Sequence, residues 1–441
     1  MAGIFKAYDI RGIYGTELTE ELALRIGRAF ATFLNCRKVV IGRDMRPHSR
    51  PLFDALARGL NLQGADVIDL GMCSTPMSYF ANHRLQADAG IMITASHNTG
   101  EWNGFKLCRA GAVPISGSTG IKDIEKLVNT GAFATPAVKP GTIHAHDIIP
   151  EYIAHVKKLA DIRRPLRVAV DMANSMGIYE SRALQGLFEI DPLFDMLDGT
   201  FPNHEANPLK TETLDALRHK VRNGRYDFGM AFDGDADRVG FVDEEGRIVP
   251  MDIMTALIAE ELLRREKGVI FYDLRSSWAV PEVIRENGGT PMMSRVGHAF
   301  IKQQMRESNA IFAGELSGHY YFRDNSFTES SAMAAICVAN IISRTGRTLS
   351  ALIAPIQRYH ASGEINSEIH NPQAALDLLK QRYHDGRLIA LDGISIEYDD
   401  WWFNVRTSNT EPLIRLNIEA KTEAMMVARR DELLAIIRQG K

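Results

Sequence analysis

The sequence has few cysteines, no long apolar run and no excess of positive charge. Four cysteines occur in 441 residues, far apart and without a C-x-x-C pair, so a disulfide scaffold is excluded and a reducing cytoplasm is the expected compartment. The longest apolar stretch, Ala332 to Ile342, is interrupted by Asn340 and is shorter than the about 18 residues that a bilayer span requires. We therefore predict a buried helix there and no membrane association. Because Lys6 and Asp9 interrupt the amino-terminal segment, no secretory signal is expected.

Acidic and basic residues are nearly balanced. The chain carries 51 Lys and Arg against 55 Asp and Glu, a formal net charge of -4. Nucleic-acid binding requires a basic surface field, so we expect no nucleic-acid partner. An anionic ligand would have to be held by a local cluster of cations.

Length and composition indicate a globular protein with several domains. Hydrophobic residues make up 45% of the chain and charged residues 24%, which provides enough apolar material for several cores. At about 150 residues per domain the chain corresponds to about three domains, with a small fourth allowed.

A repeated unit of strand, helix, strand, helix and strand organises most of the chain. The first strand of each unit is an apolar run that ends on an aspartate; these runs are Lys38 to Asp44, Arg167 to Asp171 and Gly268 to Asp273. The third strands are Ala89 to Thr94, Asp227 to Phe232 and Ala310 to Ala313. Continuous apolar runs separated by helices are typical of parallel strands buried on both faces.

We therefore predict three consecutive α/β/α units with mainly parallel sheets. One of the intervening helices spans Thr19 to Leu34, where Thr19 can cap the first turn. Its apolar stripe consists of Leu22, Ile26, Phe30 and Phe33. Ligands bind at the carboxyl ends of the strands in such sheets. Each third strand runs into a polar loop, so the three loops are expected to share one cleft.

The carboxyl-terminal part has a different pattern. Three alternating segments joined by short turns predict an antiparallel meander; they are Ile394 to Tyr398, Trp401 to Arg406 and Leu413 to Ile418. Thr422 is expected to cap a closing helix that ends near Gly440. The chain is thus expected to close with a smaller α+β domain. The predicted domains span residues 1-147, 148-247, 248-359 and 360-441.

The loop from Asp233 to Arg238 carries the most specific signal. Asp233, Asp235 and Asp237 alternate after a strand, and their mutual repulsion is tolerable only with a cation between them. Oxygen ligands favour Mg²⁺ or Ca²⁺ over zinc. A solvated acidic turn is the simpler alternative. An EF-hand is disfavoured, because Arg238 stands where its loop needs glycine and a strand precedes the loop.

Ser96 lies in a polar turn, Thr94-Ala95-Ser96-His97-Asn98, after the third strand of the first unit. A pair of Ser96 and His97 would suit a hydrolase, but G-x-S-x-G is absent and adjacent side chains usually diverge. A serine that merely forms the turn is the other alternative. The nearby metal loop and cations favour a functional hydroxyl.

Several cations stand at or near the ends of predicted strands: Arg11, Lys106, Arg238, Arg275 and Arg406. Each alone would be an ordinary surface charge. The segment Arg406 to Thr410 combines a guanidinium with hydroxyls and turn N–H groups, which suits a phosphate group and equally a plain hairpin turn. Glu315-Leu316-Ser317-Gly318-His319 offers polar groups around a glycine that allows close approach of a ligand such as a sugar.

In this order the motifs resemble the α-D-phosphohexomutase superfamily, most closely its phosphomannomutase/phosphoglucomutase branch. The resemblance covers essentially the whole chain through Tyr8 to Gly12, Thr94 to Asn98, Asn103 to Lys106, Asp233 to Arg238, Arg275, Val296 to His298, Glu315 to His319 and Arg406 to Pro412. It implies three α/β domains and one smaller domain around one cleft.

The resemblance also implies a role for each site residue. Ser96 is the phosphorylated serine, and Asp233, Asp235 and Asp237 hold Mg²⁺ together with a phosphoserine oxygen. Glu315 and Ser317 hold sugar hydroxyls. The non-reacting phosphate is held by Arg406, Ser408, Asn409 and Thr410. Further substrate contacts are implied for Tyr8, Arg275, His298 and His319. The remaining catalytic groups are Arg11, Lys106, Arg238 and His319, among which Lys106, His319 and Arg11 are candidates for general acid and base.

The implied reaction interconverts hexose 6-phosphate and hexose 1-phosphate, with mannose, glucose or both as the sugar. Phosphoserine gives its phosphoryl group to the free hydroxyl, the hexose 1,6-bisphosphate turns end over end, and Ser96 takes back the other phosphate. The bisphosphate is thus intermediate and activator. A phosphosugar is the expected partner, and a monomer or homodimer the expected assembly.

Two positions depart from the family pattern, and one position separates its branches. Arg275 stands where lysine is frequent, which changes the hydrogen-bond geometry, and Thr99 stands where proline is common. Leu316 is typical of mannose and glucose mutases, whereas glucosamine mutases tend to have glutamine there and Ser-Gly-Thr in place of Ser408-Asn409-Thr410. A phosphoglucosamine mutase, a Mg²⁺-dependent sugar phosphatase with phosphate on Asp233, and a non-catalytic sugar-phosphate or Ca²⁺ binding protein remain as alternatives.

Overall fold

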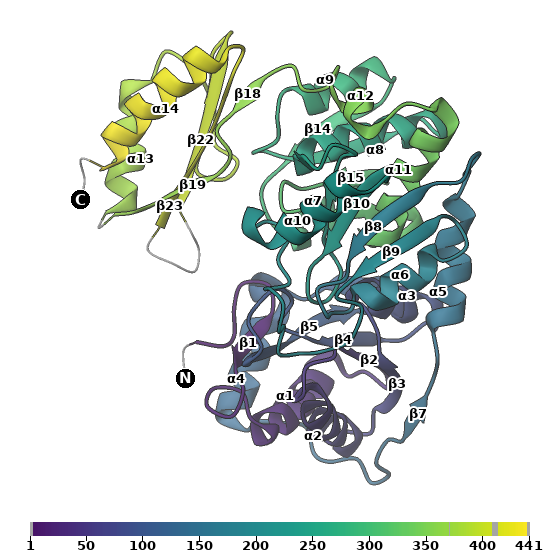
Figure 1. Cartoon of the computed structure of the whole chain (residues 1–441). Coiled ribbons are helices and arrows are strands. Elements are labelled where there is room, and N and C mark those ends of the chain that lie inside the picture. Colours follow the sequence, from purple (N-terminus) through teal and green to yellow (C-terminus); the bar gives the residue numbers. More distant parts are fainter. Residues whose placement is uncertain (1–2, 370, 408–412, 439–441) are drawn as a thin grey trace.

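The computed structural model describes residues 3–369, 371–407 and 413–438, and within these residues four sheets follow one another along the chain (Figure 1). The first sheet has the strand order β1-β5-β4-β2-β3-β7, with β6 beside β5. Its strands are β1 (Ile10–Ile13), β2 (Lys38–Arg43), β3 (Asp66–Met72), β4 (Ala89–Ile93), β5 (Trp102–Arg109), β6 (Val113–Pro114) and β7 (Ile143–Ala145). Its helices are α1 (Glu20–Leu34), α2 (Ser49–Leu62), α3 (Thr75–Arg84) and α4 (Lys122–Thr130).

The second and third sheets repeat one design, with the orders β12-β11-β10-β8-β9 and β14-β13-β15-β16-β17. The second unit contains α5 (Ile149–Val156), β8 (Arg167–Asp171), α6 (Gly177–Leu184), β9 (Glu189–Leu193), α7 (Asp215–Asn223), β10 (Phe228–Phe232), β11 (Val239–Val242) and β12 (Ile248–Val249). The third contains α8 (Met251–Arg265), β13 (Val269–Asp273), α9 (Ala279–Glu286), β14 (Thr290–Ser294), α10 (His298–Ser308), β15 (Phe312–Gly314), β16 (Tyr320–Phe322), β17 (Thr328–Glu329), α11 (Ser331–Thr345) and α12 (Leu349–Ile353).

The three sheets are more mixed than the sequence predicts. In each unit the first predicted strand pairs in parallel with the two strands that follow it: β2 with β3 and β4, β8 with β9 and β10, and β13 with β14 and β15. The chain then returns antiparallel, as β5, β11 and β16. The predicted α/β fold is confirmed. The antiparallel pairs occur because each polar loop joins its strand directly to the neighbouring strand in the sheet, as in β4-β5, β10-β11 and β15-β16.

Local predictions for two helices are confirmed. Thr19 caps α1, its Oγ1 accepting a hydrogen bond from the N–H of Leu22 at 3.2 Å, and the stripe residues Ile26 and Phe30 are fully buried. The apolar stretch predicted as a buried helix is α11. Its polar Asn340 is satisfied by backbone groups of the preceding unit, accepting from the N–H of Asp161 at 2.6 Å and donating to the carbonyl of Leu159 at 3.0 Å. Among the described helices, none has both the length and the apolar character that a membrane span requires.

The fourth sheet is entirely antiparallel and forms a separate layered unit. Its strands are β18 (His360–Ala361), β19 (Ile365–Glu368), β20 (Arg387–Ile389), β21 (Ile394–Glu397), β22 (Trp401–Thr407) and β23 (Leu413–Ala420). The predicted meander β21-β22-β23 is confirmed, whereas β18, β19 and β20 were not predicted because they are short and partly exposed. Two helices, α13 (Pro372–Arg382) and α14 (Glu423–Arg438), cover one face (Figure 1). Thr422 Oγ1 caps α14 through the N–H of Met425 at 3.3 Å.

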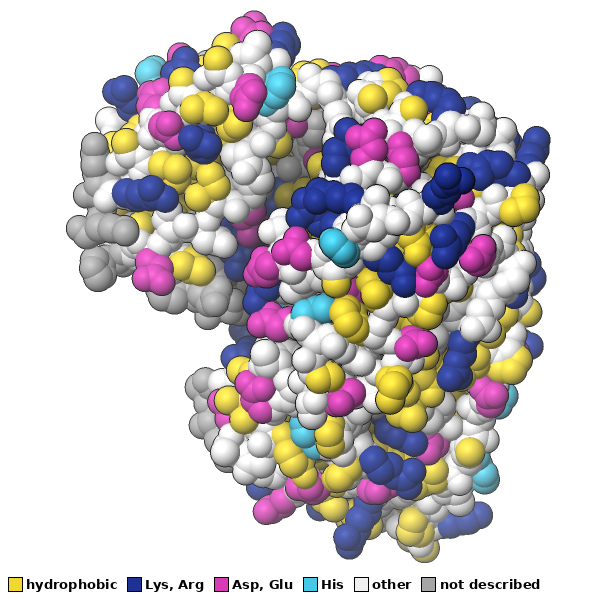
Figure 2. Space-filling view, viewed as in Figure 1, with side chains coloured by type: hydrophobic (Ala, Val, Ile, Leu, Met, Phe, Trp, Pro, Cys, Tyr) yellow, Lys and Arg dark blue, Asp and Glu magenta, His cyan; other side chains and the backbone are white. Residues whose placement is uncertain are grey.

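Two arrangements of the core position the site. One continuous apolar core joins the second and third units and reaches α3 of the first, so these three units are packed on one another. The fourth unit has its own core. Figure 2 shows the surface hollowed between this unit, at upper left, and the rest of the molecule, with acidic and basic side chains interspersed over the visible face.

Candidate active site

Ser96 lies in the loop between β4 and β5, almost fully buried and with a positive φ of 52°. Its Oγ donates to Asp233 Oδ2 at 2.8 Å, across the boundary between the first and second units. Its N–H donates to Thr94 Oγ1 at 2.9 Å. The turn therefore aims the hydroxyl at the aspartate loop.

His97 lies closer to Ser96 than the sequence argument expects. Its Nδ1 is 3.2 Å from Ser96 Oγ, so the two adjacent side chains do not diverge. Burial, reinforced by Arg238 and Arg11, keeps the pKa of His97 well below its usual value. Within the described residues no carboxylate hydrogen-bonds to the ring of His97, so the arrangement lacks the third member of a catalytic triad.

The aspartate loop between β10 and β11 is a compact anionic site. Oxygens of Asp233, Asp235 and Asp237, all buried, lie within 4.8 Å of one another. Burial and then the two neighbouring carboxylates raise the pKa of Asp233 to about 8. Asp235 Oδ1 is a buried oxygen for which the described residues supply no hydrogen bond. These converging oxygen donors fit a hard divalent cation.

Lys106 compensates part of this negative charge. Its Nζ contacts Asp235 Oδ2 at 2.6 Å and Asp237 Oδ2 at 2.5 Å. Burial opposes the charge of Lys106, but the carboxylates of Asp235 and Asp237 outweigh it, and the pKa of the ammonium group is raised. Lys106 lies on β5, so the antiparallel return of the first sheet carries it to the aspartate loop.

The rejection of an EF-hand holds in the structure. Glu244 would be the last ligand of such a loop, but its carboxylate instead accepts hydrogen bonds from the Oγ of Ser350 and, at 3.1 Å, from the N–H of Ser350. A buried strand, β10, precedes the aspartates.

The loop between β15 and β16 joins the same site. His319 Nε2 is 3.3 Å from Asp237 Oδ1 and 3.2 Å from Arg238 Nε, and an isolated bridge pairs the backbones of His319 and Arg238. Burial opposes protonation of His319, but Asp237 outweighs it and raises the pKa of the ring to about 9. Glu315 Oε2 accepts from Tyr321 Oη at 2.5 Å and lies 3.3 Å from His319 Nδ1. Ser317 Oγ is 2.8 Å from the same ring nitrogen.

Arg11 and the pair of Tyr8 and His298 form other parts of the wall. Arg11 Nη1 donates to Asn98 Oδ1 at 2.5 Å, next to the serine loop, and its other terminal nitrogen pairs with Asp9. The rings of Tyr8 and His298 lie 5.4 Å apart, centre to centre.

Arg275 and Arg406 meet at a carboxylate that the sequence did not single out. Glu364 Oε2 accepts from Arg406 Nη2 at 2.7 Å and from Arg275 Nη1 at 3.4 Å, while Arg415 Nη1 contacts Oε1 at 3.2 Å. Arg275 also pairs with Asp273 at 2.7 Å. Ser408, Asn409 and Thr410 lie outside the described residues.

One cavity of about 590 Å³ brings most of these groups together. The predicted residues that line it are Tyr8, Arg11, Ser96, Lys106, Asp237, Arg238, His298 and His319. Asp233 and Asp235 do not line the cavity, but they contact two residues that do: Asp233 contacts Ser96, and Asp235 contacts Lys106. Glu315, Ser317, Arg275 and Arg406 are not among its lining residues.

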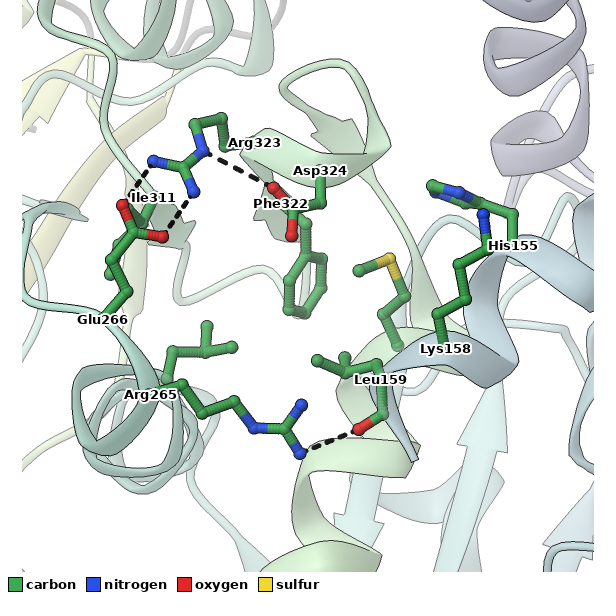
Figure 3. A pocket seen from close by; sticks show the side chains of 11 residues that line it. His155, Lys158, Leu159, Arg265, Glu266, Ile311, Phe322, Arg323 and Asp324 are labelled. Atoms are coloured by element: carbon green, nitrogen blue, oxygen red, sulfur yellow. Dashed lines mark hydrogen bonds and ion pairs between the residues drawn. The ribbon is translucent and has the colours of Figure 1, made fainter. Parts of the chain in front are cut away.

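A second cavity of about 210 Å³ lies between α5 and the third unit (Figure 3). Apolar side chains make up part of its lining, and two of its arginines are engaged: Arg323 pairs with Glu266 at 2.6 and 2.9 Å, and Arg265 donates to the carbonyl of Leu159 at 2.8 Å. None of the predicted site residues lines it. The residues that the sequence singles out therefore meet at the cavity of about 590 Å³ and not at this one.

Three supporting residues were missed by the sequence argument. Thr75, at the start of α3, donates to Asp235 Oδ2 at 2.5 Å. Asp44 and Arg46 follow β2, and Arg46 hydrogen-bonds the serine loop. All three follow a parallel strand by one to three residues, and this position is the signal that could have identified them.

Comparison with known proteins finds similarity to phosphohexomutases along nearly the whole chain. Models of the four phosphoglucomutase/phosphomannomutase domains match residues 2–135 (alpha/beta/alpha domain I), 150–246 (domain II), 250–359 (domain III) and 364–436 (C-terminal domain). A phosphomannomutase of Escherichia coli is 40% identical, covering 98% of this chain and 99% of the relative. Phosphohexose mutases of Xanthomonas campestris are 38% identical, covering 99% of both chains. A solved phosphoglucomutase/phosphomannomutase family protein of Burkholderia thailandensis superposes with a TM-score of 0.91 at 32% identity, covering 99% of this chain and 97% of that one.

The loops that meet in the larger cavity, the four matched domains and the full-length similarity lead to one conclusion: the chain belongs to the phosphoglucomutase/phosphomannomutase family.

Proposed function

We propose that the protein is a phosphohexomutase that interconverts the 6-phosphate and 1-phosphate of mannose, glucose or both, through phosphorylated Ser96 and a hexose 1,6-bisphosphate. The observation that carries this proposal is that Ser96, whose Oγ contacts Asp233 at 2.8 Å, lines a cavity together with Arg11, Lys106 and Arg238. The full-length similarity to phosphomannomutases supports it.

The cations of the cavity suit transfer of a phosphoryl group. Arg11, Lys106 and Arg238 face the cavity that Ser96 enters. A phosphoserine and a phosphosugar each carry close to two negative charges, so these side chains would neutralise the repulsion between them. In the first transfer the bond between phosphorus and the serine oxygen breaks, a bond to the free sugar oxygen forms, and that hydroxyl loses its proton. In the second transfer the bond between phosphorus and the other sugar oxygen breaks, a bond to the serine oxygen forms, and the released sugar oxygen takes up a proton. Positioning and electrostatic stabilisation supply most of the rate.

A divalent ion, which we propose to be Mg²⁺, would be held by Asp233, Asp235 and Asp237 with an oxygen of phosphoserine. When bound, it would supply positive charge next to the transferred phosphoryl group. The chain's own contribution is to hold the three carboxylates within 4.8 Å of one another and beside Ser96.

Proton transfer falls to groups that line the cavity. The pKa values of Lys106 and His319 are both raised, so each side chain carries a proton at neutral pH. Each therefore suits the general acid, which protonates the oxygen that leaves phosphorus: the serine oxygen in one transfer and the sugar oxygen in the other. A base for the sugar hydroxyl would need a group that has lost its proton. Arg11 would contribute charge beside the serine loop.

Glu315, Ser317, Arg275 and Arg406 would bind the sugar and its non-reacting phosphate. Arg275 and Arg406 already converge on the carboxylate of Glu364, a geometry that suits a phosphate group as well. Leu316 favours mannose and glucose over glucosamine substrates.

A phosphatase is less well supported. It would need Asp233 as a nucleophile facing the substrate, but Asp233 is fully buried, does not line the cavity, and accepts the hydroxyl of Ser96.

The test is conversion of mannose 1-phosphate to mannose 6-phosphate in a coupled assay with Mg²⁺ and glucose 1,6-bisphosphate. Ser96→Ala should abolish turnover, and Ser118→Ala, an exposed serine of the same unit, should leave it unchanged. Full activity of Ser96→Ala would overturn the proposal. Steady release of phosphate without isomerisation would favour the phosphatase.

A further inference from the structure

The serine loop contains carbonyl groups that its sheet does not pair. Residues 94–101 connect β4 to β5, and buried carbonyl oxygens in such a loop require donors from elsewhere. Ser96 also has a φ of 52°, a conformation that non-glycine residues adopt at a cost of about 1 kcal/mol or more. The loop therefore needs an external support to hold its shape.

Arg46 supplies that support. Its side chain is completely buried, and its guanidinium donates to four carbonyls of residues 96–102. The acceptors are Ser96 O at 3.0 Å, Asn98 O at 2.6 Å, Thr99 O at 2.5 Å and Trp102 O at 3.0 Å. Only arginine carries five N–H donors in a rigid fork, so lysine cannot reproduce this set.

Asp44 and Phe201 fix the guanidinium in turn. Asp44 Oδ2 accepts from Arg46 Nε at 3.1 Å, and its other oxygen accepts from Ser49 Oγ at 2.5 Å. Phe201, from the second unit, places its ring 5.0 Å from the guanidinium carbon of Arg46. Arg46 is thus clamped between the first unit and the unit that carries the aspartate loop.

The same carbonyl of Ser96 also touches the aspartate loop. A Cβ built on Gly234 would lie 2.1 Å from Ser96 O, so only glycine allows the two loops to approach this closely. Arg46 therefore holds the backbone of Ser96 from one side while Gly234 packs against it from the other.

We infer that Arg46 is a positioning residue for phosphoryl transfer. It fixes the backbone of residues 96–102 so that Ser96 Oγ points at the aspartate loop, and it is not among the residues that line the cavity proposed for the sugar phosphate. This inference rests on the proposed function for its kinetic part only, because its structural part concerns the loop itself.

The experiment compares Arg46→Met and Arg46→Lys with Arg43→Met. Arg43 is the matched control: it lies at the end of β2, forms an ion pair with Asp69 at 2.6 Å and packs on Phe53, and among the described residues its side chain forms no hydrogen bond or ion pair with residues 94–101. Two quantities are measured per folded molecule: kcat and KM for mannose 1-phosphate, and amide hydrogen exchange in the peptide that covers residues 94–103.

A misplacement of about 1 Å at a reacting group lowers rate by about 100-fold. We expect Arg46→Met to lower kcat by about that factor with KM within about threefold, and Arg46→Lys to lower kcat by about tenfold. Exchange should rise in residues 94–103 for both variants. Arg43→Met should change neither quantity by more than about threefold.

A kcat of Arg46→Met within threefold of the parent protein, or unchanged exchange in residues 94–103, would overturn the inference. If Arg46→Met does not fold, Arg46→Lys decides, because it keeps the buried positive charge next to Asp44. If the parent protein does not turn over hexose phosphates, the proposed function fails, and the exchange data still decide whether Arg46 fixes the loop.

Discussion

Replacing Gly234 with alanine gives a sharp test of the contact between the serine loop and the aspartate loop. The added Cβ would lie 2.1 Å from Ser96 O and 3.0 Å from the carbonyl carbon of Ser96. Both neighbours are backbone atoms that cannot swing aside. Because ordinary contacts of this kind begin at about 3.4 Å, the two loops must separate by about 1 Å.

That separation would act on the reacting atoms. Ser96 Oγ and Asp233 Oδ2 are 2.8 Å apart across the same contact, so a 1 Å shift breaks their hydrogen bond and moves the hydroxyl away from the carboxylates. We predict a fall in kcat of about 100-fold for mannose 1-phosphate. The Mg²⁺ concentration for half-maximal activity should rise as well.

The assay pairs steady-state kinetics with thermal unfolding. Gly117→Ala is the control, because the nearest atom to its added Cβ, the carbonyl oxygen of Ala7, is at 3.5 Å, so the methyl group fits without moving a neighbour. A Gly234→Ala protein that folds and retains activity within threefold of the parent would refute the claim that this contact sets the geometry of the site.

Three further predictions concern stability. Burial raises the pKa of Glu180 to about 7 from 4.5, so as pH rises between these values only the unfolded chain loses the proton. The free energy of unfolding should therefore fall by about 3 kcal/mol over this pH range because of this group. In denaturant titrations at several pH values Glu180→Gln should reduce this dependence of stability on pH, and an equal pH dependence in both proteins would contradict the assignment. Lys302 and Glu329 form a buried ion pair at 2.6 Å, so Glu329→Gln should lower the free energy of unfolding by about 3–5 kcal/mol. Asp54→Asn, which breaks an exposed ion pair, should lower it by less than about 1 kcal/mol. Similar losses of stability in urea unfolding for the two variants would contradict this dependence on burial. Thr19→Ala removes the cap of α1 and should cost about 1 kcal/mol, an effect that Thr19→Ser should largely avoid if the hydroxyl is the cause.

Much of the fold follows from short-range patterns. The apolar runs that became β2, β8, β10 and β13 are buried strands at nearly the predicted positions. This happens because a strand buried on both faces needs a continuous apolar run, which few other structures produce. The cap at Thr19 is likewise a local interaction, set by a side chain and a backbone group three residues away.

Other parts depend on the tertiary arrangement and left weak traces in the sequence. Arg46 binds carbonyls about fifty residues later in the chain, and Glu364 receives arginines from two sheets. No spacing rule connects such positions. His97 turns toward Ser96 because the loop adopts a positive φ there, which a rule about adjacent side chains does not foresee.

The site itself lies between these two cases. That its loops would come together was predictable, because each loop follows a strand and parallel strands end at the same edge of a sheet. That Lys106 would pair with Asp235 and Asp237 was not predictable, since it depends on the antiparallel return of β5.

The most direct test of the central claim is the position of the phosphate on the protein. The protein is incubated with Mg²⁺ and glucose 1,6-bisphosphate whose phosphates carry ¹⁸O, the excess is removed, and the peptide that contains Ser96 is analysed by mass spectrometry before and after addition of unlabelled mannose 6-phosphate. We predict an acid-stable ¹⁸O-labelled phosphate on Ser96 that is replaced by unlabelled phosphate on addition of the sugar phosphate, because Ser96 passes on its own phosphoryl group and takes back the other one. Phosphate on Asp233, or sugar turnover with no phosphate ever found on Ser96, would contradict it.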